Sequence, residues 1–173
     1  ASPGPNEVNK EIEILKAIIN IHKTVDEKKA GPCLKLARIY NSLDRWKESM
    51  ELIEPLLKLK KPEEQDITTD LKREWAYAAI HSNLQDKYGS KQEGLEVLNE
   101  VIEIYASDAT KSKELAFCYN LLAHAEKENW LENLEKAYQH SKGNPYAYVA
   151  MMVEQFAVNP EYFSTNMDLY AMP

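Results

Sequence analysis

The side chains that could take part in acid–base or metal chemistry are carboxylates, histidines and cysteines. Glu126, Glu128 and Glu132 form a dense carboxylate group, but their spacing is that of a polar helix face. The four histidines are dispersed along the chain: His22, His81, His124 and His140. A zinc site needs its ligands at short, regular separations. We therefore assign the carboxylates to solvated helix faces and predict no metal site.

The sequence also gives no sign of a catalytic nucleophile. Cys33 and Cys118 both fall in apolar helical segments, which predicts buried reduced thiols, with a disulfide as the alternative. His124 lies on an apolar helix face, where a hydrogen-bonded core histidine is the more common role. Neither a glycine-rich phosphate loop nor a Gly-x-Ser-x-Gly elbow occurs in the sequence. These observations predict a protein that is not an enzyme and that holds no cofactor.

The length and net charge of the chain limit which kinds of protein it can be. The 173 residues fit one domain. The net charge of −7 repels a phosphate backbone, so no nucleic-acid partner is expected. Because no apolar run approaches the roughly 18 residues of a membrane span, none is predicted. The chain contains no Asn-x-Ser/Thr site and no visible signal peptide, so a cytoplasmic location is expected, although a removed signal peptide would leave no trace.

Residues 31–62 carry the clearest structural pattern. Two apolar helical periods are joined by a short polar turn at Asp44-Arg45. The first period consists of Leu36, Ala37, Tyr40 and Leu43, and the second of Ser49, Leu52, Ile53 and Leu56. The small residues Ala37 and Ser49 are placed where two helices would approach closely. A unit of this kind cannot bury its apolar face alone, which predicts stacked neighbours and a binding function.

An N-terminal helix is expected over residues 6–28, with two apolar stripes. One stripe is Val8, Ile12, Leu15, Ile19 and His22; the other is Ile14, Ile18, Ile21 and Val25. Two stripes predict burial on more than one side. We expect this helix to pack against the first repeat, and a coiled-coil dimerisation helix is the alternative.

Two further helix pairs follow, near residues 70–105 and 109–140, and a last helix is expected between Pro145 and Val158. Residues 1–5 are predicted to be a disordered tail, residues 6–158 a helical domain, and residues 159–173 a C-terminal tail. The expected fold is all-α, an antiparallel helix-pair solenoid of about seven to nine helices. The last helix is predicted to cap the solenoid.

These pairs resemble tetratricopeptide repeats. Leu36-Ala37 with Tyr40 matches the family's Leu-Gly…Tyr block, Trp46 takes the place of a turn aromatic, and Pro62 stands close to the closing proline. The later pairs match more loosely, through Tyr77-Ala78 and Phe117-Cys118. The resemblance covers roughly residues 30–145. It implies a superhelix whose first helices line a concave groove that holds a peptide or a partner helix.

Transferred as geometry alone, the resemblance implies a set of groove residues. They are Leu34, Lys35, Arg38, Asn41, Lys72, Trp75 and Tyr119. The first helices are rich in Lys and Arg while the second helices are rich in Glu, so the groove is predicted to prefer an acidic segment or a terminal carboxylate held by Arg38 and Lys72. The alternative is that these are solvated charges. The two aromatic residues are either partner anchors or packing residues.

The expected function is therefore that of a protein–protein interaction scaffold or adaptor. Its partner is a protein or peptide, and an acidic one is preferred by the basic groove. Leu34 and Ala76 stand where chaperone-tail binders carry clamp residues, so heat-shock chaperone tails are not predicted as ligands. The alternative function is that of a structural subunit that self-associates through the ends of the repeat array and the C-terminal tail.

Overall fold

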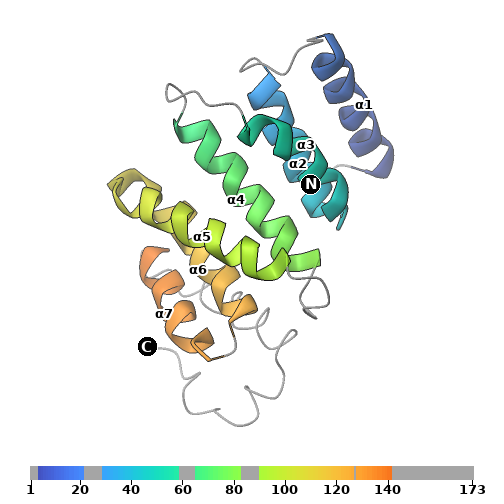
Figure 1. The fold of residues 1–173 in the computed structure, drawn as a ribbon. Coiled ribbons are helices and arrows are strands. Elements are labelled where there is room, and N and C mark those ends of the chain that lie inside the picture. The colour runs from blue at the N-terminus through green and yellow to red at the C-terminus, as the bar shows by residue number, and fades with distance from the viewer. Residues whose placement is uncertain (1–3, 22–28, 59–64, 83–89, 127, 142–173) are drawn as a thin grey trace. The chain divides into compact units, whose positions relative to one another are not determined.

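The computed structural model describes residues 4–21, 29–58, 65–82, 90–126 and 128–141, and every regular element in these ranges is a helix (Figure 1). The elements are α1 (Pro5–Ile21), α2 (Ala30–Ser42), α3 (Trp46–Leu57), α4 (Gln65–Ser82), α5 (Ser90–Ala106), the 3-10 segment η3 (Ala109–Lys111), α6 (Ser112–Ala125) and α7 (Trp130–His140). The prediction of an all-α fold is confirmed. The expected last helix and C-terminal tail lie outside the described residues.

The chain divides into two compact units, residues 1–101 and 102–173. In the first unit, α1 packs on α2, and α2 and α3 pack on each other and on α4 (Figure 1). In the second unit, α6 packs on α7. The helix pairs lie where the sequence predicted them. The stacking of three pairs into one superhelix, and the single domain over residues 6–158, stay predictions.

The turn between α2 and α3 is as short as the sequence indicated. Asp44 adopts a positive φ of 58°, a left-handed conformation that Asp tolerates better than most residues. The Arg45 amide then donates to the Tyr40 carbonyl over 2.9 Å, and the Arg45 guanidinium lies 4.5 Å from the centre of the Tyr40 ring. These contacts fold α3 back against α2.

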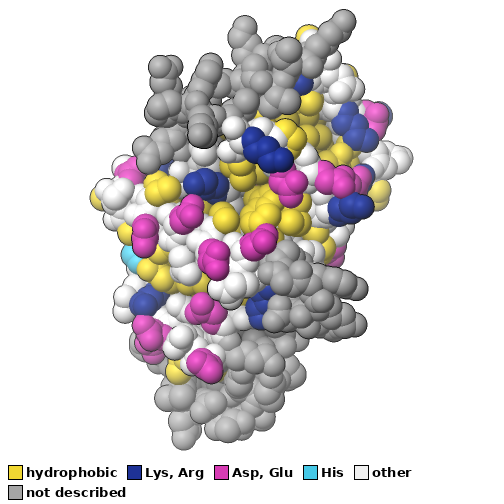
Figure 2. All heavy atoms as spheres, viewed as in Figure 1, with side chains coloured by type: hydrophobic (Ala, Val, Ile, Leu, Met, Phe, Trp, Pro, Cys, Tyr) yellow, Lys and Arg dark blue, Asp and Glu magenta, His cyan; other side chains and the backbone are white. Residues whose placement is uncertain are grey.

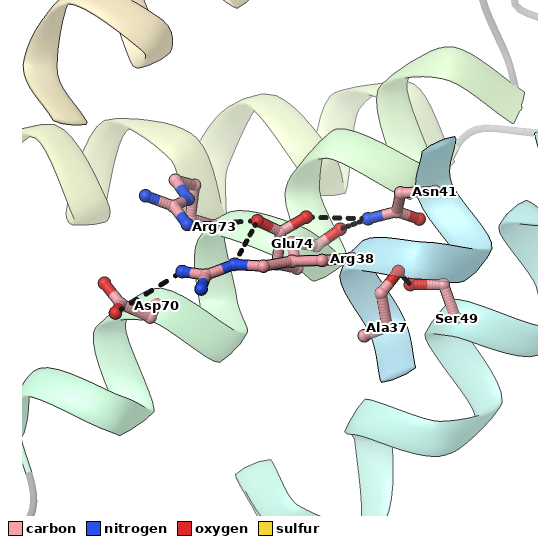
Figure 3. Close-up of polar contacts among 7 residues, drawn as sticks. All are labelled: Ala37, Arg38, Asn41, Ser49, Asp70, Arg73 and Glu74. Carbon is pink, nitrogen blue, oxygen red and sulfur yellow. Dashed lines mark hydrogen bonds and ion pairs between the residues drawn. The ribbon is translucent and has the colours of Figure 1, made fainter. Parts of the chain in front are cut away.

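Close packing of this pair depends on two small residues. Ala37 and Ser49 are both fully buried, and the Ser49 hydroxyl donates to the Ala37 carbonyl over 3.4 Å (Figure 3). The predicted point of close approach is thus confirmed. Around it lies one apolar cluster: Ala30, Cys33, Leu34, Ala37, Ile53, Leu56 and Leu71. Its members come from α2, α3 and α4, so α4 completes the core of the first pair.

A second close approach joins α4 and α5. A Cβ atom on Gly94 would lie 3.0 Å from Ile80 Cγ1, 3.1 Å from Ala79 Cβ and 3.3 Å from the Ala76 carbonyl oxygen. These distances are tighter than most Cβ contacts, so an added side chain would have to displace its neighbours. Glycine at this position lets α5 approach α4 closely.

Gly94→Leu should lower the free energy of unfolding by about 2 kcal/mol, because the added side chain overfills a packed interface. The matched control is Gly31→Leu in α2, where a Cβ meets no atom within 4 Å. That change should alter stability by less than about 1 kcal/mol, because Leu favours helix over Gly whereas a side chain before Pro32 disfavours the helical conformation. Urea unfolding followed by circular dichroism measures both, and equal losses would contradict the steric explanation.

Helix α1 buries only one of its two apolar stripes. Ile12 and Leu15 are buried against Leu36 and Tyr40 of α2. On the other stripe, Ile14 is 60%, Ile18 37% and Ile21 74% exposed. We call these three residues the isoleucine stripe. The prediction that α1 is buried on more than one side is therefore wrong for the described part of the chain, because α1 lies against the first pair on one side only.

Both cysteines are buried free thiols, as predicted. Burial raises the pKa of the Cys33 thiol to about 11, against the weaker opposing field of Lys29. Because only the thiolate reacts readily, Cys33 is expected to be inert at neutral pH. His124 is also buried in α6, in keeping with its predicted place in the core.

Candidate protein-interaction surface

Two of the polar residues predicted for the groove, Arg38 and Asn41, converge on a carboxylate of the chain itself. Glu74 of α4 is 6% exposed and lies between α2 and α4 (Figure 3). Its Oε2 accepts from Asn41 Nδ2 over 2.9 Å, and its backbone carbonyl accepts from the same nitrogen over 3.1 Å. Its Oε1 lies 3.0 Å from Arg73 Nη2 and 3.4 Å from Arg38 Nε. Glu74 is thus held by three partners.

A second carboxylate extends this network. Asp70 Oδ2 lies 3.7 Å from Arg38 Nη2, so the Arg38 guanidinium faces two acids of α4. The Arg38 side chain is still 47% exposed, whereas Asn41 is 3% exposed. Asn41 therefore serves the packing of α2 on α4. A partner carboxylate at Arg38 would have to compete with Glu74 and Asp70.

The remaining groove residues of the first unit also have internal neighbours. Leu34 belongs to the apolar cluster of the pair. Lys35 pairs with Glu11 of α1 over 3.0 Å, and Lys72 with Glu100 of α5 over 3.2 Å. Trp75 is partly buried against the same cluster, and its Nε1 donates to Glu54 of α3 over 3.4 Å.

These pairs show where three basic residues of the first helices find their acidic neighbours. Basic residues of the first helices lie beside acidic residues of neighbouring helices and neutralise them, so the two signs are interspersed on the surface. On the face drawn in Figure 2, Lys and Arg side chains lie next to Asp and Glu side chains around hydrophobic ones. The helical periodicity of the sequence showed which helices carry basic or acidic residues, but it did not show that these residues form ion pairs.

Tyr119 belongs to the second unit. Its ring stacks on His140 of α7 with a centroid separation of 5.4 Å and an interplanar angle of 7°, and Lys136 Nζ lies 5.7 Å from its centre. These contacts join α6 to α7. Six of the seven predicted residues therefore lie in the first unit, and Tyr119 has a packing role in the second.

Trp46, assigned to structure from its sequence position, lies in an aromatic group with α4. Its ring stacks on His81 at 5.2 Å and meets the edge of Tyr77 at 5.7 Å, while Tyr77 and His81 are 4.2 Å apart. The group fixes the start of α3 against α4.

An open hollow lies between α1 and α2, where no groove was predicted. Its volume is about 410 Å³, and its lining is Glu7, Lys10, Glu11, Ile14, Leu15, Ile18 and Lys35. We call it the α1–α2 hollow. It adjoins the isoleucine stripe and contains one predicted groove residue, Lys35. The signal that could have revealed it is the second stripe of α1, which had no obvious neighbour to cover it.

Within the described ranges, no three or more His, Cys, Asp or Glu residues are grouped as a metal site would require. None of the described helices has the length and apolar character needed to cross a membrane. The described surface offers adjacent exposed apolar side chains on α1 and several ion pairs between neighbouring helices.

Comparison of the chain with family models, curated proteins and solved structures finds no match. The resemblance to tetratricopeptide repeats therefore rests on the sequence pattern alone and stays a prediction.

Proposed function

We propose that this chain is a non-catalytic protein-interaction module, a scaffold or adaptor of tetratricopeptide-like helix pairs that binds a helix of a partner protein. The observation that carries the proposal is the isoleucine stripe. Soluble proteins seldom leave several large apolar side chains adjacent and exposed unless the surface binds something. A row of apolar residues separated by four and three positions is the form in which one helix receives another.

The structure of the first unit favours a different contact surface from the predicted groove. The groove cations Lys35, Arg38 and Lys72 each lie against an acid of the chain itself, so little uncompensated positive charge remains for an acidic segment. The isoleucine stripe beside the α1–α2 hollow instead presents apolar side chains that are still exposed. We therefore place the partner helix along α1, with Lys35 at its border.

A structural-subunit function remains the second candidate, and the isoleucine stripe favours it too. Helix α1 lies at an end of the helix series in the first unit (Figure 1), and the alternative function uses such ends for self-association. The C-terminal tail, which it also invokes, lies outside the described residues.

Affinity capture with the full chain, followed by mass spectrometry, tests the function. Three forms are compared: the unchanged chain, the I14K/I21K variant and the R38E/K72E variant. We expect a captured protein to be lost from I14K/I21K and retained by R38E/K72E, because only the first changes the proposed contact surface.

The opposite pattern, with loss only from R38E/K72E, would instead restore the acidic-partner groove on α2 and α4. A chain that captures no protein in any form would contradict the adaptor function and leave the structural-subunit function. Unfolding midpoints of the two variants serve as the folding control.

A further inference from the structure

We infer that the helix received by the isoleucine stripe is α1 of a second copy of this chain, so that the protein forms a two-fold homodimer through α1. This inference rests on the contact surface of the proposed function, the isoleucine stripe, and gives that surface the occupant that the second candidate function expects. It draws on three properties of the α1–α2 hollow: the spacing of its apolar residues, the balance of its charges and its size.

The spacing suits a helix of the same kind. Ile14, Ile18 and Ile21 follow one another at intervals of four and three residues, which is the seam of two helices packed side by side. An isologous contact requires a patch that complements itself, and a row of identical aliphatic side chains does so. Each copy would cover the exposed surface of the other.

The charges around the hollow favour a copy over a strongly charged partner. The rim carries two acids, Glu7 and Glu11, and two bases, Lys10 and Lys35, and thus no net charge. The whole chain carries −7, so two copies repel each other over most of their surface. A neutral patch with both signs is where they can approach with least repulsion.

Ion pairing inside one copy leaves part of this rim available. Lys35 is bound to Glu11. Among the described residues Lys10 makes no ion pair, and the carboxylate of Glu7 meets only the Gly4 amide, over 3.2 Å. A second copy offers Lys10 an acid and Glu7 a base. An acidic partner would pair only with Lys10, and a basic partner only with Glu7.

The size of the patch sets the strength of the contact. Helix α1 has 17 residues and is about 25 Å long, and the stripe occupies its C-terminal half. A contact limited to half of this helix is expected to bury less than the roughly 800 Å² per partner of a standard stable interface. The dimer should therefore be weak and reversible, with a Kd in the micromolar range.

Sedimentation equilibrium of the purified full chain tests the inference. Over concentrations from about 1 to 300 μM, a span chosen for a weak interface, the average mass should rise from 19.9 kDa toward twice that value. In I14K/I21K the mass should stay at 19.9 kDa, although the two added lysines make the chain less negative and so reduce the general repulsion between copies. The control L43K changes a leucine that is 44% exposed elsewhere on α2–α3 and should dimerise as the unchanged chain does.

A cysteine variant locates the contact. Ile18 is the middle of the stripe, so it meets Ile18 of the second copy when the two helices run parallel, which is the arrangement that also brings Glu7 and Lys10 of the two copies together. Oxidised I18C should give a covalent dimer, whereas L43C should stay a monomer. The native thiols are buried in each copy and should not interfere.

Three results would overturn the inference. A mass of one chain at all concentrations would exclude the dimer, and a rise that persists in I14K/I21K would move the contact to another surface. A monomer that loses stability on I14K/I21K would show that the same chain covers its own stripe. The chain can also stay monomeric while I14K/I21K fails to capture a protein that the unchanged chain captures. That result would refute the homodimer and leave the adaptor function in place.

Discussion

Glu74→Ala is expected to lower the free energy of unfolding by about 3 kcal/mol, because it removes one partner from a buried ionic network. The Asn41 amide would keep the backbone carbonyl at position 74 but lose its closer carboxylate acceptor, and the Arg73 guanidinium would lose a carboxylate 3.0 Å away, both in a buried part of the first unit (Figure 3). Arg38 is half-exposed and can turn to solvent, so most of the loss should come from the other two partners. Urea unfolding measures the change.

Glu51→Ala is the matched control for that experiment. Glu51 is also a helical glutamate with a basic partner, Lys47, at 3.8 Å, but its side chain is 64% exposed. An exposed pair of this kind contributes less than about 0.5 kcal/mol. Glu74→Gln should give an intermediate loss, since it keeps an acceptor for Asn41 and removes the charge. If Glu74→Ala and Glu51→Ala cost the same, Glu74 does not hold α2 to α4.

Ile53→Ala is expected to lower the free energy of unfolding by about 4 kcal/mol, through lost apolar burial and the cavity left behind. Ile53 of α3 is fully buried in the cluster shared by α2, α3 and α4. It thus holds both helices of the first pair and the first helix of the second. Thermal or urea unfolding of the full chain measures the loss.

Ile14→Ala provides the same chemical change at an exposed helix position. Ile14 is 60% exposed, and Ala is the better helix former, so the stability should change by less than about 0.5 kcal/mol. A large loss from Ile14→Ala, measured below the concentrations at which the chain associates, would mean that part of the chain covers the stripe. A small loss from Ile53→Ala would contradict the described core.

Several local features follow from the sequence because they depend on neighbouring residues. A period of about 3.6 residues, with polar turns between, was enough to place α2 and α3 and the turn at Asp44. Ala37 and Ser49 were predicted to lie at a close approach, and both are fully buried. A small residue among large apolar ones on a helix face marks the place where a second helix can come close. The free thiols of Cys33 and Cys118 follow from the same apolar periods.

Other features could not be obtained from the sequence, because they depend on which helix lies opposite. Periodicity assigned two apolar stripes to α1, but only packing on α2 decided that Ile12 and Leu15 are buried and Ile14 is not. Nor could it show that Arg38 faces Glu74, a residue 36 positions further along the chain.

The sequence by itself therefore determined the helices and the small residues that let them pair. Only the tertiary structure decided which charges lie beside each other and which apolar face of α1 stays exposed. The physical reason is that periodicity fixes the direction of a side chain about its own helix axis, whereas a contact depends on the position of a second axis. That position is set by the packing of the whole core.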